Sequence, residues 1–264
     1  GEANDYISDN PFLVSGRKRA AIAAEIVARP EIEIPVGPGT DLDASAAIGV
    51  RQYHRRYGRY LTGRAQARAR HRRNEYLSVE ASAFYDRELA ADALTDTIDF
   101  AADTRSIRIN HGARASISWT PNATTAITGV ANWQKVRFPD STLLVTTDAY
   151  DFTLGVSKRV SSTTSFGLQG QMTYSRPVDN LNTSAKAIRL TADHRFATAW
   201  RADVQVGVEW AELGGPAGIR QPARARLSGA VNLCYEPERI TACVNAAMRS
   251  EVSGLGGLQR EVAV

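Results

Sequence analysis

Apolar and polar residues alternate one by one along most of this chain, and no other feature of the sequence constrains its fold as strongly. Between Ile107 and Thr120 the odd positions are Ile, Ala or Trp apart from His111, whereas the even positions are Arg, Asn, Gly, Ser or Thr. In Trp200–Ala211, Trp, Ala and Val alternate mainly with Arg, Asp, Gln and Glu. A strand sends successive side chains to opposite faces, whereas a helix repeats every ~3.6 residues. The pattern therefore predicts strands with one apolar and one polar face.

The same test predicts strands from end to end of one domain that spans residues 1–264. A short first strand lies in the N-terminal segment 1–18, and the last strand is expected to be incomplete. The predicted strands cover residues 10–14, 19–33, 41–53, 61–70, 76–86, 107–120, 124–137, 150–160, 164–175, 185–197, 200–211, 223–235 and 241–252, with one more from about 258. We expect about 14 strands, within a range of roughly 12–16.

The connections between these strands alternate in length. Residues 120–124, 160–164, 196–200 and 235–241 form short turns, whereas 87–106, 138–147, 176–184 and 212–222 form longer links. Short periplasmic turns and longer extracellular loops are typical of outer-membrane barrels. The sequence thus favours an all-β, antiparallel up-and-down transmembrane β-barrel. A soluble β-sandwich would also alternate, so the placement of particular side chains matters.

The hydropathy of the chain excludes one class of membrane protein. Its 264 residues are 43% apolar, and no stretch approaches the ~20 apolar residues that a spanning helix needs. A barrel strand exposes only every second residue to lipid, so modest average hydropathy is compatible with a barrel.

Aromatic residues of the apolar register gather at strand ends, with aliphatic residues between them. Such rings prefer the interface between headgroups and hydrocarbon, and form girdles at both edges of a membrane barrel. The predicted girdle consists of Trp119, Trp133, Tyr150, Phe166, Tyr174, Phe196, Trp200 and Trp210.

The opposite register carries too many charges for a dry core, because an unpaired buried charge is costly. A wetted lumen can hold them with ion pairs between neighbouring strands. The predicted basic lining is Arg64, Arg68, Arg70, Arg108, Arg114, Arg189, Arg224 and Arg226. The predicted acidic lining is Glu80, Asp86, Asp151, Asp193, Asp203 and Glu209.

Two interpretations of the arginine row Arg64, Arg68 and Arg70 remain open. The row could be a cationic wall that guides an anionic passenger. Alternatively, Glu80 and Asp86 on the next strand neutralise it. Arginines outnumber acids along the predicted lumen, and this favours anions in either case.

Cys234 and Cys243 lie on the polar register on either side of the turn 236–239. A hairpin centred on that turn places the two cysteines opposite each other. A disulfide suits the oxidising periplasm, whereas two thiols without a nearby His make a poor metal site. We therefore predict a disulfide and no metal.

No catalytic constellation emerges from the sequence. His111 and His194 lie on the apolar register, while His54 and His71 lie near the rims. We expect no enzymatic activity and no cofactor. The acidic loop 86–103 is expected to be either a surface loop or an inward constriction. The basic, aromatic loop around Arg55, Arg56 and Arg59 suits lipopolysaccharide phosphates as a partner, and not nucleic acid.

Short motifs give the chain a resemblance to a known family. They are SDNPF at Ser8–Phe12, RPEIEIP at Arg29–Pro35, the tyrosine- and arginine-rich hairpin that follows, and the turn SKRVSSTTSF at 157–166. The chain resembles an outer-membrane β-barrel porin family that is often encoded beside exopolysaccharide export genes. Outer-membrane barrels usually end on an aromatic residue, whereas this chain stops at Val264.

The resemblance implies a Gram-negative outer-membrane protein, with its N-terminus in the periplasm, in contact with outer-membrane lipid and lipopolysaccharide. Polysaccharide-export or surface-assembly proteins are the expected protein partners. The leading functional hypothesis is a polar, net-cationic channel for a polar or anionic solute or polysaccharide. The alternative is a structural barrel that anchors a surface or periplasmic assembly without transport.

Overall fold

A computed structural model describes residues 2–8, 21–53, 58–90, 106–178, 182–196, 199–212, 223–235, 242–252 and 258–263. In this part of the chain all regular structure is β. The strands are β1 (Glu2–Ser8), β2 (Ala21–Ala28), β3 (Glu31–Gly37), β4 (Thr40–Tyr53), β5 (Arg59–Asn74), β6 (Leu77–Leu89), β7 (Ile107–Asn122), β8 (Thr125–Arg137), β9 (Thr147–Arg159), β10 (Thr164–Pro177), β11 (Thr183–Arg195), β12 (Trp200–Glu212), β13 (Arg224–Tyr235), β14 (Ala242–Val252) and β15 (Leu258–Ala263). Within the described ranges, no helix is long and apolar enough to cross a membrane.

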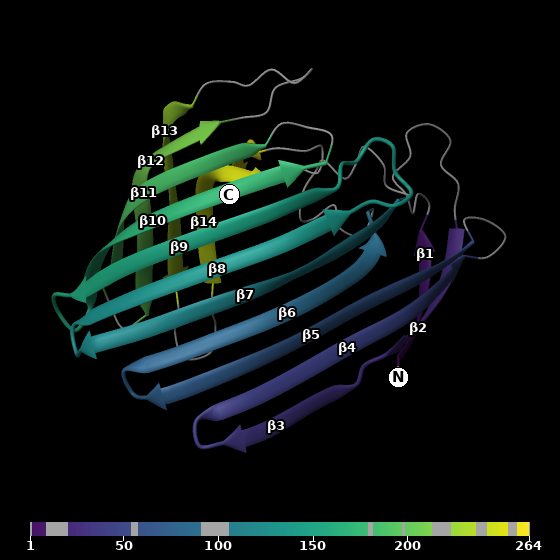
Figure 1. Cartoon of the computed structure of the whole chain (residues 1–264), viewed down its shortest axis with the longest axis horizontal. Helices are drawn as coiled ribbons and strands as arrows, with labels where there is room; N and C mark the ends of the chain where they lie inside the picture. Colours follow the sequence, from purple (N-terminus) through teal and green to yellow (C-terminus); the bar gives the residue numbers. More distant parts are fainter. Residues whose placement is uncertain are drawn as a thin grey trace.

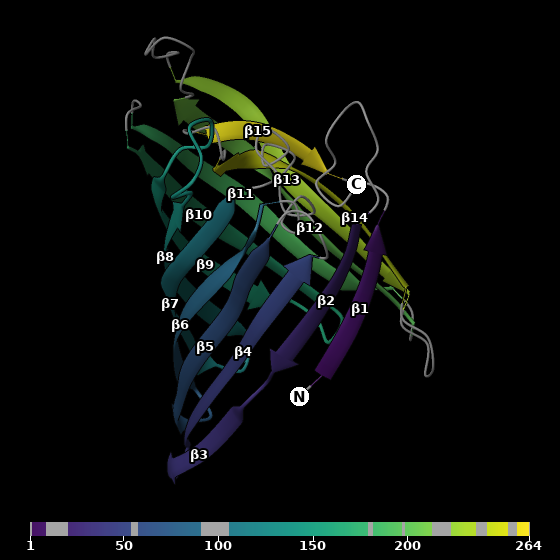
Figure 2. The same ribbon diagram turned by 90° about the vertical axis from the view of Figure 1, so that its right-hand side faces the viewer.

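The fifteen described strands form a single antiparallel sheet in which, from β4 onward, each strand pairs with the next one in the sequence; β2 and β3 both pair with β4 and not with each other. Figure 1 shows the strands side by side in a curved sheet. The predicted all-β, up-and-down meander is confirmed. Viewed from the side, the sheet curls so that β1 and the β13–β15 end lie on the same side of the molecule (Figure 2). Among the described residues, β1 and β15 do not pair with each other.

The N-terminal strands differ from the prediction in two ways. The predicted strand at residues 19–33 is divided, because β2 pairs with the second half of β4 and β3 with the first half. Pro30 lies at the break and has no N–H to donate to a ladder. The strand predicted at 10–14 lies outside the described residues, and β1 begins earlier, at Glu2. Because β2 and β3 lie end to end, the described ladder is fourteen strands wide.

The predicted alternation of connection lengths is confirmed for most links: two residues join β5 to β6 and β7 to β8, whereas nine join β8 to β9. It is wrong in detail at two links, because six residues separate β13 from β14 and only five separate β10 from β11. Short turns lie at the left end of the sheet in Figure 1, and the longer links lie at the other end. Two of these turns share one device: the side-chain oxygen of Asn74 accepts hydrogen bonds from two following backbone N–H groups, and Asn122 does the same. The β3–β4 turn instead uses Gly39, whose positive φ of 74° suits glycine. We call this the short-turn end of the sheet.

The two faces of the sheet differ in exposure as well as in polarity. In β11 the side chains of Ile188 and Leu190 are 53% and 64% exposed, while Arg189 between them is 5% exposed. Aliphatic residues on other strands are also open to the surroundings, including Ile48, Leu154 and Val206. The apolar register therefore faces outward, and the polar register lines the inside of the curve.

The predicted disulfide is present. Cys234 on β13 and Cys243 on β14 lie directly opposite each other with their Cα atoms 4.1 Å apart, and their sulfur atoms are bonded. The predicted turn at 236–239 lies outside the described residues.

Replacing both Cys234 and Cys243 with Ser should destabilise the chain by about 2–3 kcal/mol, because the bridge removes the loop-closure entropy of a short segment from the unfolded state. The shift in urea midpoint of refolded protein in detergent measures this loss. Reduction of the unaltered protein is the control and should give the same shift. Equal midpoints for oxidised, reduced and substituted protein would contradict a stabilising bridge.

Candidate functional site

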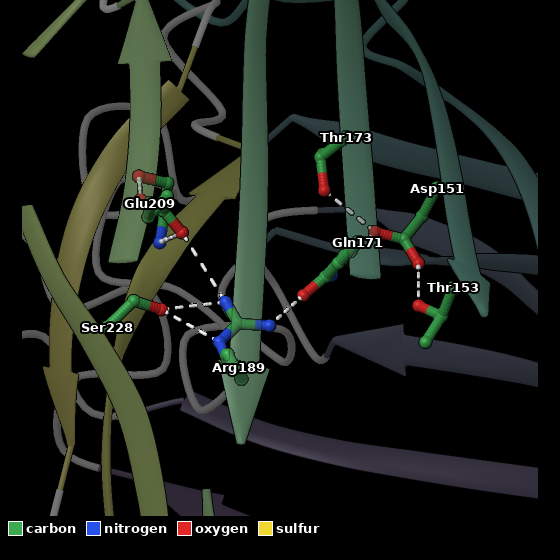
Figure 3. Close-up of polar contacts among 8 residues, drawn as sticks. Asp151, Thr153, Gln171, Thr173, Arg189, Glu209 and Ser228 are labelled. Carbon is green, nitrogen blue, oxygen red and sulfur yellow. Dashed lines mark hydrogen bonds and ion pairs between the residues drawn. The ribbon is translucent and has the colours of Figure 1, made fainter. Parts of the chain in front are cut away.

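A buried polar network lies on the concave face around Arg189. Its guanidinium donates from Nε and Nη2 to Ser228 Oγ on β13, at 2.9 and 2.7 Å, and from Nη1 to Gln171 Oε1 on β10, at 2.5 Å. Glu209 Oε2 on β12 lies 3.5 Å from Nη2. Figure 3 shows these side chains converging on the guanidinium from three strands. Arg189 is thus both hydrogen-bonded and charge-paired, as a buried guanidinium requires.

The network continues to β9 through Gln171. Its amide nitrogen donates to Asp151 Oδ2 at 2.7 Å, while its oxygen accepts from Arg189. Thr173 donates to the same Asp151 oxygen at 2.7 Å, and Thr153 to the other at 3.3 Å (Figure 3). The Gln171 amide therefore bridges the Arg189 guanidinium and the Asp151 carboxylate, and these two partners fix its orientation.

Gly207 lies between Arg189 and Ser228 and allows the β11 backbone to approach β12 closely. It lies directly opposite Arg189 on β12, on the same face. A Cβ at this position would overlap the carbonyl oxygen of Ile188 and lie 2.6 Å from Arg189 Cα. Side chains of β11 and β13 can meet over the glycine, across the strand that separates them. This contact places the network on the inner side of the curve.

The C-terminal hairpin lies over the same face. Strand β14 pairs with β13 only from Ala242 to Met248 and then leaves it. Ser250 beyond that point donates its backbone N–H to Glu209 Oε2 at 3.3 Å, and its hydroxyl donates to the other Glu209 oxygen. Leu258, at the start of β15, packs against Ala185 and Ala211. Glu209 therefore holds both Arg189 and the hairpin.

The structure distinguishes between the two interpretations of the arginine row. Each arginine of the row is paired with a carboxylate of a neighbouring strand: Arg64 with Asp86 at 3.1 Å, Arg68 with Asp43 at 3.0 Å, and Arg70 with Glu80 at 3.1 Å. These carboxylates neutralise the arginine row, so the row is not a free cationic wall. Asp43 was not among the predicted lining residues, although its register indicated it.

The other predicted lining residues divide into paired and open positions. Arg108 is bound to Glu88 at 2.6 Å. Arg201 donates to Asp193 at 2.9 Å and to Asp203 at 3.0 Å. The remaining predicted arginines are Arg114 and Arg224, which are exposed, and Arg226, which is half-buried and lies opposite Glu209.

The predicted girdle residues lie at the two ends of the outer face. Towards the long links, Trp133, Tyr150 and Tyr174 are directly opposite one another on β8, β9 and β10. At the short-turn end, the Trp200 and Tyr235 rings lie 4.9 Å apart. Tyr235 was not among the predicted girdle residues, although it is the last residue of β13, directly after Cys234. The other members are Trp119, Phe166, Phe196 and Trp210, all of which are exposed.

The described histidines serve in local contacts. His111 packs edge-on against Trp133 at 5.7 Å, and His194 Nδ1 lies 2.8 Å from Thr164 Oγ1. His71 Nδ1 contacts Thr40 Oγ1 at 2.8 Å. Among the described residues no three His, Cys, Asp or Glu side chains gather in a metal-binding arrangement. His54, Arg55, Arg56 and most of the acidic loop 86–103 lie outside the described residues.

Sequence reasoning missed the uncharged members of the central network. Gln171, Ser228 and Gly207 all lie on the predicted inner register, but only charged residues were selected from it. The signal in the sequence for a buried guanidinium was Gly207, an inner position without a side chain, opposite Arg189.

Comparison with known proteins finds likeness in structure but none in sequence. No family model matches the sequence, and no curated protein matches it. The chain is similar to the structure described as "Crystal structure of a Pseudomonas aeruginosa FadL homologue", with 11% identity and a TM-score of 0.39 over 92% of this chain and 74% of that one. At this TM-score the likeness carries no weight for function.

Replacing Arg189 with Met should cost about 3–5 kcal/mol, because it leaves the buried Glu209 carboxylate without the arginine that pairs with it. Replacing Arg70 with Gln breaks an exposed ion pair and should cost less than about 1 kcal/mol. Urea unfolding followed by tryptophan fluorescence compares the two. The double substitution R189M/E209Q removes both charges and should recover part of the loss. Similar midpoints for R189M and R70Q would show that the central network is not enclosed as described.

Proposed function

We propose that this chain is a β-barrel of the bacterial outer membrane whose polar inner face forms a passage for polar solutes. One observation carries the proposal: aliphatic side chains cover the outer face and are widely exposed, while a hydrogen-bonded arginine is buried on the inner face. In water this arrangement would expose a large apolar surface with no compensation. In a bilayer the outer residues contact hydrocarbon, and the charges are enclosed.

The width and direction of the ladder support closure into a barrel. The described ladder is fourteen strands wide, so its two edge strands run antiparallel, as neighbours in an up-and-down barrel must. Both edges lie on the same side of the molecule (Figure 2). An open edge cannot persist in lipid, because unpaired backbone groups find no water there. In lipid both edges of the sheet must therefore be paired or covered.

The proposed orientation follows from the connections. Short turns face the periplasm and longer links face outward in outer-membrane barrels. This orientation places the Cys234–Cys243 bridge in the oxidising compartment and the N-terminus on the periplasmic side. Arg59 and Tyr60 then lie at the outer end and suit lipopolysaccharide as a partner. Polysaccharide-export or surface-assembly proteins remain proposed partners.

The proposed passenger is a polar and preferably anionic solute or polysaccharide. The acids on the inner face that the structure resolves are largely occupied by arginines, whereas Arg114 and Arg224 are exposed without a bound carboxylate in the described chain. We propose no catalytic role, because the described histidines are held by aromatic rings and hydroxyl groups.

A second candidate function is an anchoring barrel without transport. The observation that favours it is the C-terminal hairpin, which lies over the inner face and is held there by Glu209 and by the packing of Leu258. A hairpin in that position reduces the free cross-section of a barrel. Conductance separates the two functions.

The purified chain, inserted into planar phosphatidylcholine bilayers, should give single-channel currents whose reversal potential in a KCl gradient indicates a preference for chloride. Arg114→Glu should shift that potential toward cations, because it reverses a charge on the inner face. Lys158→Glu makes the same change on the outer register and should leave the potential unchanged. Correctly folded protein that inserts and never conducts would support the anchoring function instead.

Lipid contact is tested by one pair of neighbouring residues. Val206 in the middle of β12 is 48% exposed on the outer face, and Gln205 beside it faces inward. Val206→Arg should destabilise the membrane-inserted protein by about 2–4 kcal/mol, the cost of Arg near the bilayer midplane. Gln205→Arg should cost far less. Urea titration from vesicles measures both, and equal effects would contradict an outer face in lipid.

A further inference from the structure

A second polar site lies at the short-turn end of the concave face, away from the Arg189 network. The turns that join β5 to β6, β7 to β8 and β9 to β10 surround it with the ends of β11 and β12, and enclose a hollow of about 860 Å³. This volume lies within the range of small-molecule sites, roughly 300–1,000 Å³. Ser157, Ser165 and Asp193 on its wall share the inward register, so the hollow opens from the inside of the curve.

The charged residues on its wall are Glu75, Arg159, Asp193, Arg195 and Arg201, and the last three belong to two opposing pairs of like charge on β11 and β12. Asp193 lies directly opposite Asp203, and Arg195 lies directly opposite Arg201. Like charges directly opposite each other repel. Arg201 relieves the acidic pair by donating to both carboxylates, at 2.9 and 3.0 Å. Arg195 thereby faces another guanidinium, while the nearest carboxylate on its own strand, Asp193, is already bound.

A second arginine lies across β10 from this cluster. Arg159 is opposite Ser165, and Ser165 is in turn opposite Asp193. Both Arg159 and Arg195 are exposed and line the hollow. Within the described ranges neither arginine is ion-paired with a carboxylate. Hydroxyl groups of Ser and Thr fill much of the wall between them.

We infer that this hollow binds an anionic saccharide, with its phosphate or carboxylate at Arg159 and Arg195 and its hydroxyl groups at the Ser and Thr side chains. Guanidinium groups bind such anions through charge-assisted, often paired, hydrogen bonds. Hydroxyl groups and Asp193 supply donors and acceptors for the neutral part of the ligand. The inference rests on the proposed function, since it identifies the class of passenger that enters at the short-turn end.

The test is binding of glucose 6-phosphate to the full chain, folded in an uncharged polyoxyethylene detergent without lipid and measured by calorimetry. Each of Arg159→Gln and Arg195→Gln should weaken binding about tenfold, the effect of one charge-assisted hydrogen bond. Arg176→Gln removes the same charge at the opposite end of β10 and should change binding less than about twofold. Glucose without phosphate should bind at least about tenfold more weakly.

Three results would overturn the inference: no binding of glucose 6-phosphate to the folded chain, equal losses in the Arg176 control, or equal binding of glucose and its phosphate. Arg195→Lys retains charge and serves as the second variant if Arg195→Gln fails to fold; it should bind better than any uncharged replacement. Vesicles with and without phosphatidylglycerol distinguish a lipid headgroup, because a headgroup site would lose glucose 6-phosphate binding only with the anionic lipid present. If the chain binds glucose 6-phosphate but does not conduct, the proposed channel is overturned and the saccharide site stands. If the chain conducts but does not bind glucose 6-phosphate, the saccharide site is overturned and the proposed channel stands.

Discussion

The backbone hydrogen-bond ladder is the constraint on which the rest of this structure depends. Nearly every described strand pairs antiparallel on both edges, so its side chains must alternate between two faces. Once the sheet curls, one face becomes enclosed and the other remains open. The placement of Ile188 and Leu190 outside and Arg189 inside follows from that geometry, and it inverts the usual arrangement of a protein in water.

The enclosed face stays stable because its polar groups satisfy one another. Arg189 is desolvated, and its attraction to Glu209 alone would not repay that cost. Ser228 and Gln171 supply further acceptors, and Gln171 connects the guanidinium to Asp151. Glu209 shares its two oxygens between Arg189 and Ser250. The same carboxylate thus stabilises the strand network and holds the C-terminal hairpin over the concave face, where the hairpin bears on whether solutes can pass.

Charge is distributed unevenly along the inner surface. On β5, three arginines are paired with carboxylates of β4 and β6. These ion pairs join neighbouring strands and add little net positive potential to the inner face. At the short-turn end, Asp193 and Asp203 both bind Arg201, and Arg195 opposite Arg201 stays exposed. An anion moving along the inner face would therefore meet uncompensated positive charge at particular places, such as Arg114 and Arg195, and not along a continuous row.

The sequence by itself determined the strands from β4 onward, the two faces, the alternation of short and long connections and the pairing of Cys234 with Cys243. All of these depend on local period and turn symmetry, which neighbouring residues set. Only the tertiary structure decided between a free and a neutralised arginine row, that Arg189 reaches Ser228 across Gly207, and that β14 leaves β13 to cross the concave face. These depend on side-chain reach, on the curvature of the sheet and on contacts across an intervening strand, and a two-residue period contains none of them. The break at Pro30 was readable in principle, because a residue without an N–H interrupts a ladder wherever the fold places it.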